Sequence, residues 1–407
     1  MKAPHCEAII VGAGPVGLLL ACLLGQRGIR TLLLEKRTEP IIHSHAIGIT
    51  PPSLHILEKL DLAKSFIDQG VKVVDCIIHG EHRRLGCMSF RDIPDDYRFI
   101  LSLPQSETIR LLKAKLTSYP SVSALSGMEI THVAQDSNHC EIRYLDAHHG
   151  TTHSVTTDYL CASDGSRSRV RDILKIPTEG KSYRCHFVMG DFIDRSDLGA
   201  EAHLYFTSRG SIESFPLPNS QRRWIVQTPE RLDSAPAGLI SEIVQQRTGL
   251  IVPASDQQNQ NIFTPRRLNC VRYHEGRVLL LGDAAHVMSP IGGQGMNTGF
   301  ADAEFLADAL DSILRRHAAH EPLFNAYNRY RRRAASIAIA RAGRGMWLGT
   351  WQGKPASALR DLLLDRLFLN GPFSKAMAPY FAMLTIPFNT LDRVPLPPLR
   401  LPSSTTT

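Results

Sequence analysis

The chain has 407 residues, of which 43% are hydrophobic and 21% are charged. These values are ordinary for a globular protein, and the length suits two closely joined domains. The net charge is +7, and part of the excess lies in a basic cluster formed by Arg329, Arg331, Arg332, Arg333, Arg341 and Arg344. No nucleic-acid motif accompanies this cluster, so we expect no nucleic-acid partner and interpret the cluster as a solvated helix face. Attachment to an acidic membrane surface is the less favoured alternative.

The cysteines and the chain start bear on the cellular setting. The eight cysteines are scattered and form no C-x-x-C pair, which argues against a disulfide framework and against a metal site. The chain enters an apolar run almost at once, without a cleavage site, and no stretch has the length of a membrane span. We therefore expect a cytoplasmic protein without a metal, and leave its oligomeric state open.

The first half of the chain predicts an α/β domain. Residues 8–11 and 31–34 are apolar runs without polar alternation, and residues 15–26 form an apolar helix between them. Such strands indicate a parallel sheet covered on both faces. The pattern then changes to short alternating strands punctuated by turns, at residues 186–189, 203–206 and 223–226. These strands predict an inserted antiparallel sheet.

The α/β pattern returns in the last third of the chain. We expect a strand at residues 277–281, helices at 301–314 and 321–347, and another helix around 358–368. The first domain would then comprise residues 1–75, 100–180 and 273–345, and the second domain residues 76–99 and 181–272. A helical region at 346–394 and a flexible tail rich in Pro, Ser and Thr at 395–407 would complete the chain.

A glycine-rich turn joins the first strand to the first helix. Gly12, Gly14 and Gly17 match G-x-G-x-x-G in the strand–turn–helix context that the motif requires. Gly12 allows the tight turn, Gly14 lets a pyrophosphate approach the backbone, and Gly17 lets the helix pack closely. An acidic residue, Glu35, ends the second strand, where it can bind ribose hydroxyls. The predicted dinucleotide contacts are Gly12, Gly14, Pro15, Val16, Gly17, Glu35 and Lys36.

Two later segments of the sequence indicate which dinucleotide is bound. Asp164-Gly165 follows an apolar run and by itself could be an ordinary turn. The segment from Gly282 to Gly299, GDAAHVMSPIGGQGMNTG, joins a strand to a helix through an unusual number of glycines. Such a connection brings backbone close to a ligand, and the helix presents its positive end there.

With these three segments in order, the sequence resembles the class A flavoprotein monooxygenases, the family of p-hydroxybenzoate hydroxylase, phenol hydroxylases and polyketide aromatic hydroxylases. The resemblance extends from about residue 8 to about residue 342. It implies a Rossmann-like FAD-binding domain, an inserted antiparallel β-sheet domain for the substrate, and C-terminal helices. The third segment is close to diagnostic, whereas the first is shared with many dinucleotide-binding proteins.

The resemblance also implies roles by position. Asp283 would contact the ribityl or ribose side of FAD, and Gln105 the ribityl chain. Asp164 belongs to a segment implicated in the use of both FAD and pyridine nucleotide. Backbone N–H groups of Gly295, Met296 and Asn297 would lie by the flavin pyrimidine ring, Pro290 would lie near the edge where oxygen reacts, and His286 would pack beside the cofactor. One position departs from the family: His45 stands where an arginine is common, with Arg37 as a weak substitute.

The implied activity is that of an FAD-dependent monooxygenase, a hydroxylase that consumes NADH or NADPH. It would insert one oxygen atom from O2 into an activated aromatic, phenol-like substrate through a flavin C4a-hydroperoxide. The alternatives are an FAD-dependent halogenase, a reductase or epoxidase of an isoprenoid or quinone-type lipid, and a binding protein without turnover. The W-x-W-x-I-P segment of related halogenases is absent, and the glycine loop argues against a mere scaffold.

The residues that touch the substrate are harder to name from the sequence. His186, His203 and Tyr205 lie in the predicted substrate sheet and could take a phenol proton, but packing or surface roles are the better interpretation. A second set could line the pocket or fill the core: Phe206, Phe215, Pro216 and Trp224. We assign a catalytic role to none of these residues.

Overall fold

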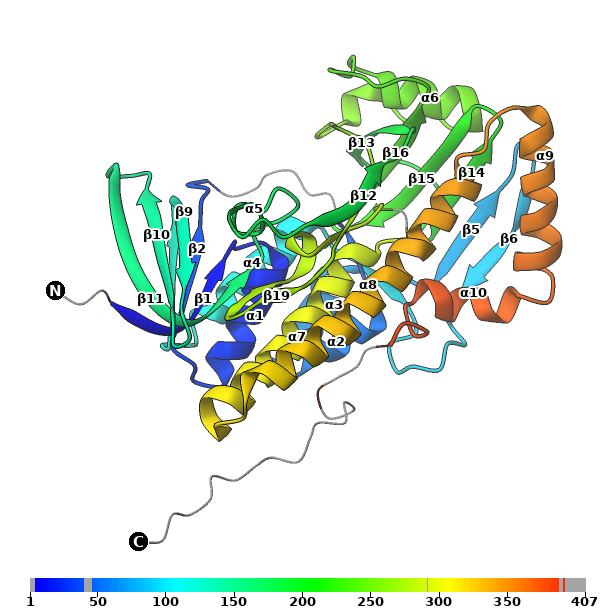
Figure 1. The fold of residues 1–407 in the computed structure, drawn as a ribbon. Helices are drawn as coiled ribbons and strands as arrows, with labels where there is room; N and C mark the ends of the chain where they lie inside the picture. The colour runs from blue at the N-terminus through cyan, green and yellow to red at the C-terminus, as the bar shows by residue number, and fades with distance from the viewer. Residues whose placement is uncertain (1–3, 40–45, 291, 388–390, 392–407) are drawn as a thin grey trace, which may run out of the picture.

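The computed structural model describes residues 4–39, 46–290, 292–387 and 391. Two large sheets lie at opposite ends of the molecule, and the long helices α7 and α8 run between them (Figure 1). The mixed α/β architecture with a large inserted sheet confirms the predicted fold class.

An eight-stranded sheet organises the first end. Its main path is β19-β20-β11-β1-β2-β8, in which every pair from β20 to β8 is parallel, and a hairpin of β9 and β10 joins the far part of β11. The strands are β1 (His5–Val11), β2 (Thr31–Glu35), β8 (Val122–Ser126), β9 (Met128–Gln135), β10 (Cys140–Asp146), β11 (Thr151–Ala162), β19 (His274–Glu275) and β20 (Val278–Leu280). The expected strands at 8–11, 31–34 and 277–281 are therefore confirmed.

Helices cover this sheet because its central strands are apolar on both faces. The helices packed on the sheet or on its covering helices are α1 (Pro15–Gln26), α2 (Pro51–Glu58), α3 (Ala63–Gln69), α4 (Gln105–Leu116), α5 (Arg169–Ile173), α7 (Gln294–Arg316) and α8 (His320–Gly349). Helix α7 begins at Gln294 rather than at the expected Ala301. The two glycines in its first turns suggested a loop, but Gly293 in the left-handed region (φ 63°) starts the helix before them.

A seven-stranded sheet organises the other end, in the order β17-β13-β16-β15-β14-β5-β6. The strands are β5 (Asp75–His79), β6 (Arg84–Ser89), β13 (His186–Ile193), β14 (Ala202–Thr207), β15 (Gly210–Leu217), β16 (Gln221–Thr228) and β17 (Asn261–Phe263). The prediction of an antiparallel sheet is correct except for the parallel pair β5–β14, whose strands come from distant parts of the chain and need no hairpin. The expected polar alternation is wrong in β13 and β16, because α6 (Leu239–Thr248) buries the second face.

Smaller elements connect the two ends. One three-stranded sheet contains β3 (Gly48–Ile49), β7 (Ile100–Ser102) and β4 (Val71–Val73), and another contains β12 (Thr178–Ser182), β18 (Arg266–Cys270) and β21 (His286–Val287). Beyond α8, the helical turns α9 (Lys354–Leu363), η3 (Leu364–Leu369) and α10 (Ser374–Phe381) lie beside β5, β6 and β14 (Figure 1). Short 3-10 turns occur at η1 (Ala254–Asp256) and η2 (Gly282–Ala284). The expected tail, residues 395–407, lies outside the described residues.

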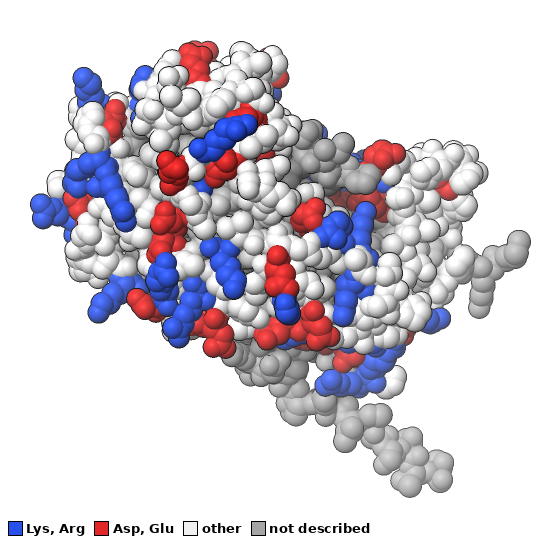
Figure 2. Space-filling view, turned by 180° about the vertical axis from the view of Figure 1, so that it is seen from behind, with Lys and Arg blue, Asp and Glu red and all other residues white. Residues whose placement is uncertain are grey.

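The surface and the cysteines are unexceptional. Basic and acidic side chains lie interspersed on the face shown in Figure 2. The eight cysteines are all unbridged, and no group of His, Cys, Asp or Glu among the described residues has the geometry of a metal site. Within the same residues, every helix is too short or too polar to cross a membrane.

Candidate functional site

The turn between β1 and α1 is held by two close backbone approaches. Gly12 has φ 99°, and a Cβ on it would lie 2.5 Å from the Ser163 carbonyl oxygen. A Cβ on Gly17 would lie 2.0 Å from the Gly12 carbonyl oxygen. The Ser163 hydroxyl donates to the carbonyls of Val11 and Gly12, at 2.9 and 3.0 Å. Only glycine fits at these two positions, because the protein itself fills the space.

Gly14 differs from its two neighbours in the motif. No heavy atom lies within 4 Å of where its Cβ would stand, so the protein leaves this side of the turn open. Gly14 is the N-cap residue of α1 and Pro15 begins the helix. Among the described residues, no side chain caps the N–H groups of its first turn. An open backbone at a helix N-terminus suits a pyrophosphate.

Glu35 lies against the same turn. Its Oε2 accepts a hydrogen bond from the backbone N–H of Ala13 at 2.7 Å, and its Oε1 accepts one from the N–H of Arg37 at 3.0 Å. The carboxylate is thereby fixed beside the glycine turn, at the distance along the second strand where it can reach ribose hydroxyls. The neighbouring Lys36 is exposed.

Asp164 joins the turn through Ser163. A Cβ on Gly12 would also lie 2.9 Å from the Asp164 Cα. The Asp164 Oδ2 accepts from the backbone N–H of Val170 at 3.2 Å, whereas its buried Oδ1 has no partner among the described residues. Burial raises the pKa of this carboxyl. An unpartnered buried oxygen beside the phosphate turn fits a role in holding a polar ligand or its water.

The loop after β20 reaches the same turn through Val16. A Cβ on Gly282 would lie 3.2 Å from Val16, and one on Gly299 would lie 2.5 Å from it. Asp283 exposes its side chain beside these contacts, yet the protein surrounding it raises the pKa of its carboxyl. The exposed side chain of Asp283 is therefore free to face a ligand at this turn.

The N-terminus of α7 carries the remaining predicted contacts of this loop. No described side chain caps the helix, so its first N–H groups, those of Gly295 and Met296 included, have no side-chain partner among the described residues. The buried Oε1 of Gln294 has no partner among the described residues. Pro290 is exposed, and its carbonyl accepts from the N–H of Gly293 at 2.9 Å. These donors and the helix dipole suit a ligand that carries negative charge.

Asn297 and Gln105 are connected through β3. The Asn297 side chain donates to the Gly48 carbonyl at 3.0 Å and accepts from the Thr50 N–H at 3.0 Å. At the other end of this segment, the Gln105 N–H donates to the Ala46 carbonyl at 3.0 Å. The Asn297 side chain is therefore occupied with the protein, and only its backbone remains for a ligand. His45, the departure from the family, lies outside the described residues.

A buried charge network fixes the glycine loop to α7 and α8. The Asp302 Oδ2 lies 2.6 Å from His286 Nε2 and accepts from the Gly282 N–H at 3.1 Å, and Oδ1 accepts from Arg331 Nε at 2.8 Å. Burial alone would raise the pKa of Asp302, but the charges and hydrogen bonds of His286 and Arg331 hold it below its ordinary value. The network supports the implied packing role of His286. The sequence prediction missed Asp302, although a carboxylate within an otherwise apolar helix stripe was a signal.

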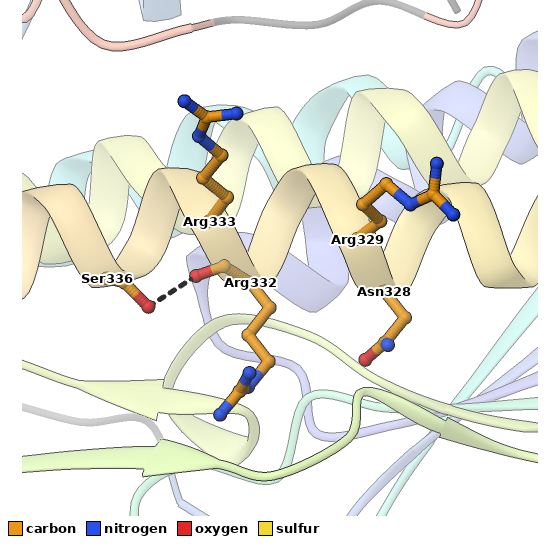
Figure 3. Close-up of a pocket in the computed structure, with 5 residues that line it drawn as sticks. All are labelled: Asn328, Arg329, Arg332, Arg333 and Ser336. Atoms are coloured by element: carbon orange, nitrogen blue, oxygen red, sulfur yellow. Dashed lines mark hydrogen bonds between the residues drawn. The ribbon is translucent and has the colours of Figure 1, made fainter.

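This network corrects the interpretation of the basic cluster. Arg331 is only 1% exposed, so it belongs to the interior rather than to a solvated helix face. Arg329 and Arg333 are exposed, as expected. A surface hollow of about 330 Å³ lies along α8, and Figure 3 shows Arg333 and Arg332 pointing to opposite sides of the helix. The hollow is lined by Asn328, Arg329, Arg332, Arg333 and Ser336.

The three candidate proton acceptors, His186, His203 and Tyr205, lie on the face of the seven-stranded sheet that α6 covers. Tyr205 packs in the cluster beneath α6, and His203 lies beside it with Nδ1 3.1 Å from His79 Nε2. His186 bonds to Thr264 at 2.8 Å. The sequence analysis missed a buried carboxylate on the opposite face of this sheet, Glu213. The available signal was its position two residues before Phe215, which places both side chains on the same face of the strand.

The residues of this site fit FAD. The open backbone at Gly14, the unpartnered oxygens of Asp164 and Gln294, and the uncapped helices α1 and α7 are features that a dinucleotide with a polar ring system would satisfy. Of the predicted residues, the structure brings together those of the glycine turn, Glu35, Asp164 and the loop containing Asp283, and it connects Gln105 with Asn297.

Comparisons with known proteins agree with this geometry. Residues 5–342 match the family described as "FAD binding domain". The chain is 31% identical to 6-methylpretetramide 4-monooxygenase of Streptomyces rimosus over 335 residues, which are 79% of this chain and 58% of that protein. It is 26% identical to para-nitrophenol 4-monooxygenase of Pseudomonas sp. (strain WBC-3) over 391 residues, or 92% and 94% of the two chains.

A solved structure shows the same fold. The crystal structure of p-nitrophenol 4-monooxygenase PnpA from Pseudomonas putida DLL-E4 superposes with a TM-score of 0.84 at 22% identity, covering 94% of this chain and 98% of that one. The chain therefore belongs to the FAD-binding-domain family, in which relatives such as these are aromatic monooxygenases.

Proposed function

We propose that the protein is an FAD-dependent monooxygenase that uses NADH or NADPH and O2 to hydroxylate an activated, phenol-like aromatic substrate. The observation that carries the proposal is the convergence of the Gly14 turn, Glu35, Asp164 and the loop before α7 on one site, in a family whose relatives include hydroxylases of phenols and polyketides. The chain spans 58% of the first of these relatives, so the activity is proposed for this chain on its own residues.

The protein would hold FAD in two parts. The α1 N-terminus and Gly14 would receive the pyrophosphate, and Glu35 the ribose, while Asp283 and the first turn of α7 would face the ribityl chain and the flavin ring. When bound, the flavin would supply the oxygen activation, through the C4a-hydroperoxide expected of this family. The buried Asp302 network would keep the loop rigid, and preorganised N–H groups at α7 would stabilise negative charge on the ring.

The seven-stranded sheet would provide the substrate surface. Leu204, Phe215 and Ile225 lie on the face away from α6 and are only partly buried, which suits an aromatic ring better than a charged ligand. We propose the domain division at residues 76–99 and 181–272 on this basis, because β5 and β6 are hydrogen-bonded into the same sheet as β13–β17.

The test begins with flavin loading. The purified chain is expected to bind FAD in a one-to-one ratio and become yellow, and a chain that stays colourless after incubation with excess FAD would refute the proposal. The loaded protein is then mixed with NADH or NADPH and a panel of phenols, quinolones and polyketide aromatics. We expect substrate-stimulated oxidation of one reductant, with oxygen uptake and a product heavier by one oxygen atom.

The same assay separates the alternative activities. Reductant oxidation that needs no oxygen and yields a reduced alkene would indicate an isoprenoid or quinone reductase instead. Oxygen uptake that yields only hydrogen peroxide with every compound would show that none of the panel is a substrate, because an unprotected flavin–oxygen adduct decays in water.

A further inference from the structure

One row of side chains crosses the seven-stranded sheet with a single acidic member. Residues directly opposite each other in paired strands point to the same face. Met189 is paired with Ile225, Ile225 with Glu213, Glu213 with Leu204, and Leu204 with Ile78. Glu213 is therefore the one carboxylate in a row whose other four members are apolar.

Two members of this row are less buried than the residues on the opposite side of the sheet. On the opposite side, Ile212 and Trp224 are buried beneath α6. On the side of Glu213, the cross-strand neighbours Leu204 and Ile225 are only partly buried, even though they belong to central strands. Glu213 itself is 8% exposed. A narrow opening to its carboxylate, walled by apolar side chains, is the arrangement expected of a pocket for a small aromatic molecule.

The same face is connected to the glycine loop at α7. A Cβ on Gly292 would lie 3.7 Å from the Phe381 ring. Phe381 in turn packs in the apolar cluster to which Leu204, Phe206 and Phe215 belong. The row that contains Glu213 and the loop expected to hold the flavin ring therefore border one continuous apolar region.

Glu213 lacks a partner where other buried charges have one. No described residue forms a hydrogen bond or ion pair with its side chain, and burial raises the pKa of its carboxyl to about 7. Farther along this face, Arg223 Nε donates to Asp191 Oδ1 at 2.6 Å. The pKa of the Cys76 thiol on β5 is raised by burial, so that group stays neutral beside Glu213.

The helices packed on this face leave Glu213 unmatched as well. Among their described residues, α8 and α10 present Met346, Leu348 and Phe381 to the apolar clusters on this face. The Arg341 guanidinium of α8 lies 4.4 Å above the Tyr380 ring and donates to the Thr385 carbonyl at 2.9 Å. The buried Arg360 of α9 lies over the Phe206 ring on this face, and it donates to the Phe206 carbonyl at 2.8 Å and to Asp361 Oδ1 at 3.1 Å.

We infer that Glu213 receives the hydroxyl proton of the aromatic substrate, because among the described residues it is the unpaired carboxylate on the sheet face that borders the glycine loop before α7. The substrate O–H bond breaks, an O–H bond forms on the carboxylate, and the substrate becomes a phenolate without any change in electron count. A phenolate donates electrons to an electrophilic oxygen more readily than the neutral phenol, so the transfer promotes the hydroxylation. This inference rests on the proposed monooxygenase function.

The test compares two phenols that differ in acidity. The FAD-loaded full chain and its Glu213→Gln variant are assayed with p-cresol, which is neutral near pH 8, and with p-nitrophenol, which is largely ionised there. We expect the wild-type kcat/KM for p-cresol to rise with pH through about 7. The variant should lose this inflection and at least ~100-fold of the rate with p-cresol, but less than ~10-fold with p-nitrophenol at high pH.

Two further variants make the result specific. Glu213→Asp keeps a carboxylate and should restore part of the p-cresol rate together with the inflection. Glu242→Gln removes an exposed carboxylate from α6, on the far side of the same sheet, and should change neither profile. If Glu213→Gln does not retain FAD, Glu213→Leu replaces it in the same comparison.

The outcomes separate the two proposals. Wild-type protein that shows no phenol-stimulated, oxygen-dependent turnover with any compound of the panel overturns the proposed function and the role of Glu213 with it. Wild-type turnover combined with an unchanged pH profile in Glu213→Gln, or with equal losses for both phenols, overturns only the role of Glu213.

Discussion

Two carboxylates in different elements of the fold are both buried, and yet their pKa values shift in opposite directions. Asp302 is fully enclosed and is matched by His286, Arg331 and a backbone N–H, and its pKa lies below the ordinary value. Glu213 is 8% exposed and unmatched, and its pKa rises to about 7. Burial by itself raises the pKa of both groups, so the difference comes from their partners.

The contrast indicates that paired and unpaired buried charges have different roles in this fold. A paired buried charge fixes one arrangement of the segments around it, and here it fixes the loop that begins at Gly282 against α7 and α8. An unpaired buried acid instead remains able to exchange a proton near neutral pH. Four experiments test this contrast between paired and unpaired buried groups.

The largest effect is expected from Asp302→Ala. The substitution leaves Arg331 buried without its counter-ion, which typically costs about 3 to 5 kcal/mol of unfolding free energy. The glycine loop should loosen and FAD retention should fall with it. Urea unfolding and the flavin content of the purified protein measure the two effects, and a variant as stable as wild type would show that the network is not structural.

Glu213→Gln is expected to raise the unfolding free energy rather than lower it. Because the folded-state pKa of Glu213 lies above the unfolded value, the folded protein binds more protons between about pH 4.5 and about pH 7, and its stability falls as pH rises through this window. The neutral amide avoids this loss. The variant should be up to about 3 kcal/mol more stable than wild type near pH 8, with little difference near pH 4.5. Chemical denaturation of both proteins at the two pH values measures this effect. A stability difference between variant and wild type that does not change with pH would contradict the raised pKa of Glu213.

Two glycines of the turn between β1 and α1 also differ, because protein atoms surround Gly17 but not Gly14. Gly17→Ala places a Cβ 2.0 Å from the Gly12 carbonyl oxygen and should cost about 1 to 3 kcal/mol of stability. Gly14→Ala meets no protein atom within 4 Å, so it should fold normally and lose at least ~10-fold in FAD affinity. Thermal unfolding of the FAD-free proteins and FAD titration separate them. Equal stability losses in both variants would remove the distinction.

The smallest effect is expected from Arg333→Ser, the exposed counterpart of buried Arg331 on α8. It should change the unfolding free energy by less than about 0.5 kcal/mol and leave FAD binding intact. The variant serves as the matched control for Asp302→Ala in the same urea experiment. A loss comparable to that of Asp302→Ala would mean that the hollow along α8 contributes to the fold.

Features that depend on local spacing could be predicted from the sequence. The glycine turn, the helix that follows it, the second strand with Glu35 at its end, and the Asp164 and Asp283 segments are each set within a few residues of chain. Backbone geometry requires particular residue types there, and such requirements are visible in a single sequence. The inserted sheet was also predictable, because its turns interrupt short strands.

Which charged groups are buried, and which residues they contact, depends on the tertiary structure. Arg331 and Arg333 are indistinguishable within a run of arginines, but only Arg331 points at Asp302 on another helix. The surroundings of Glu213 come from strands separated by more than a hundred residues, since β5 completes the row that β13 to β16 begin. Burial and pairing are properties of contacts between distant segments, and no local pattern records them.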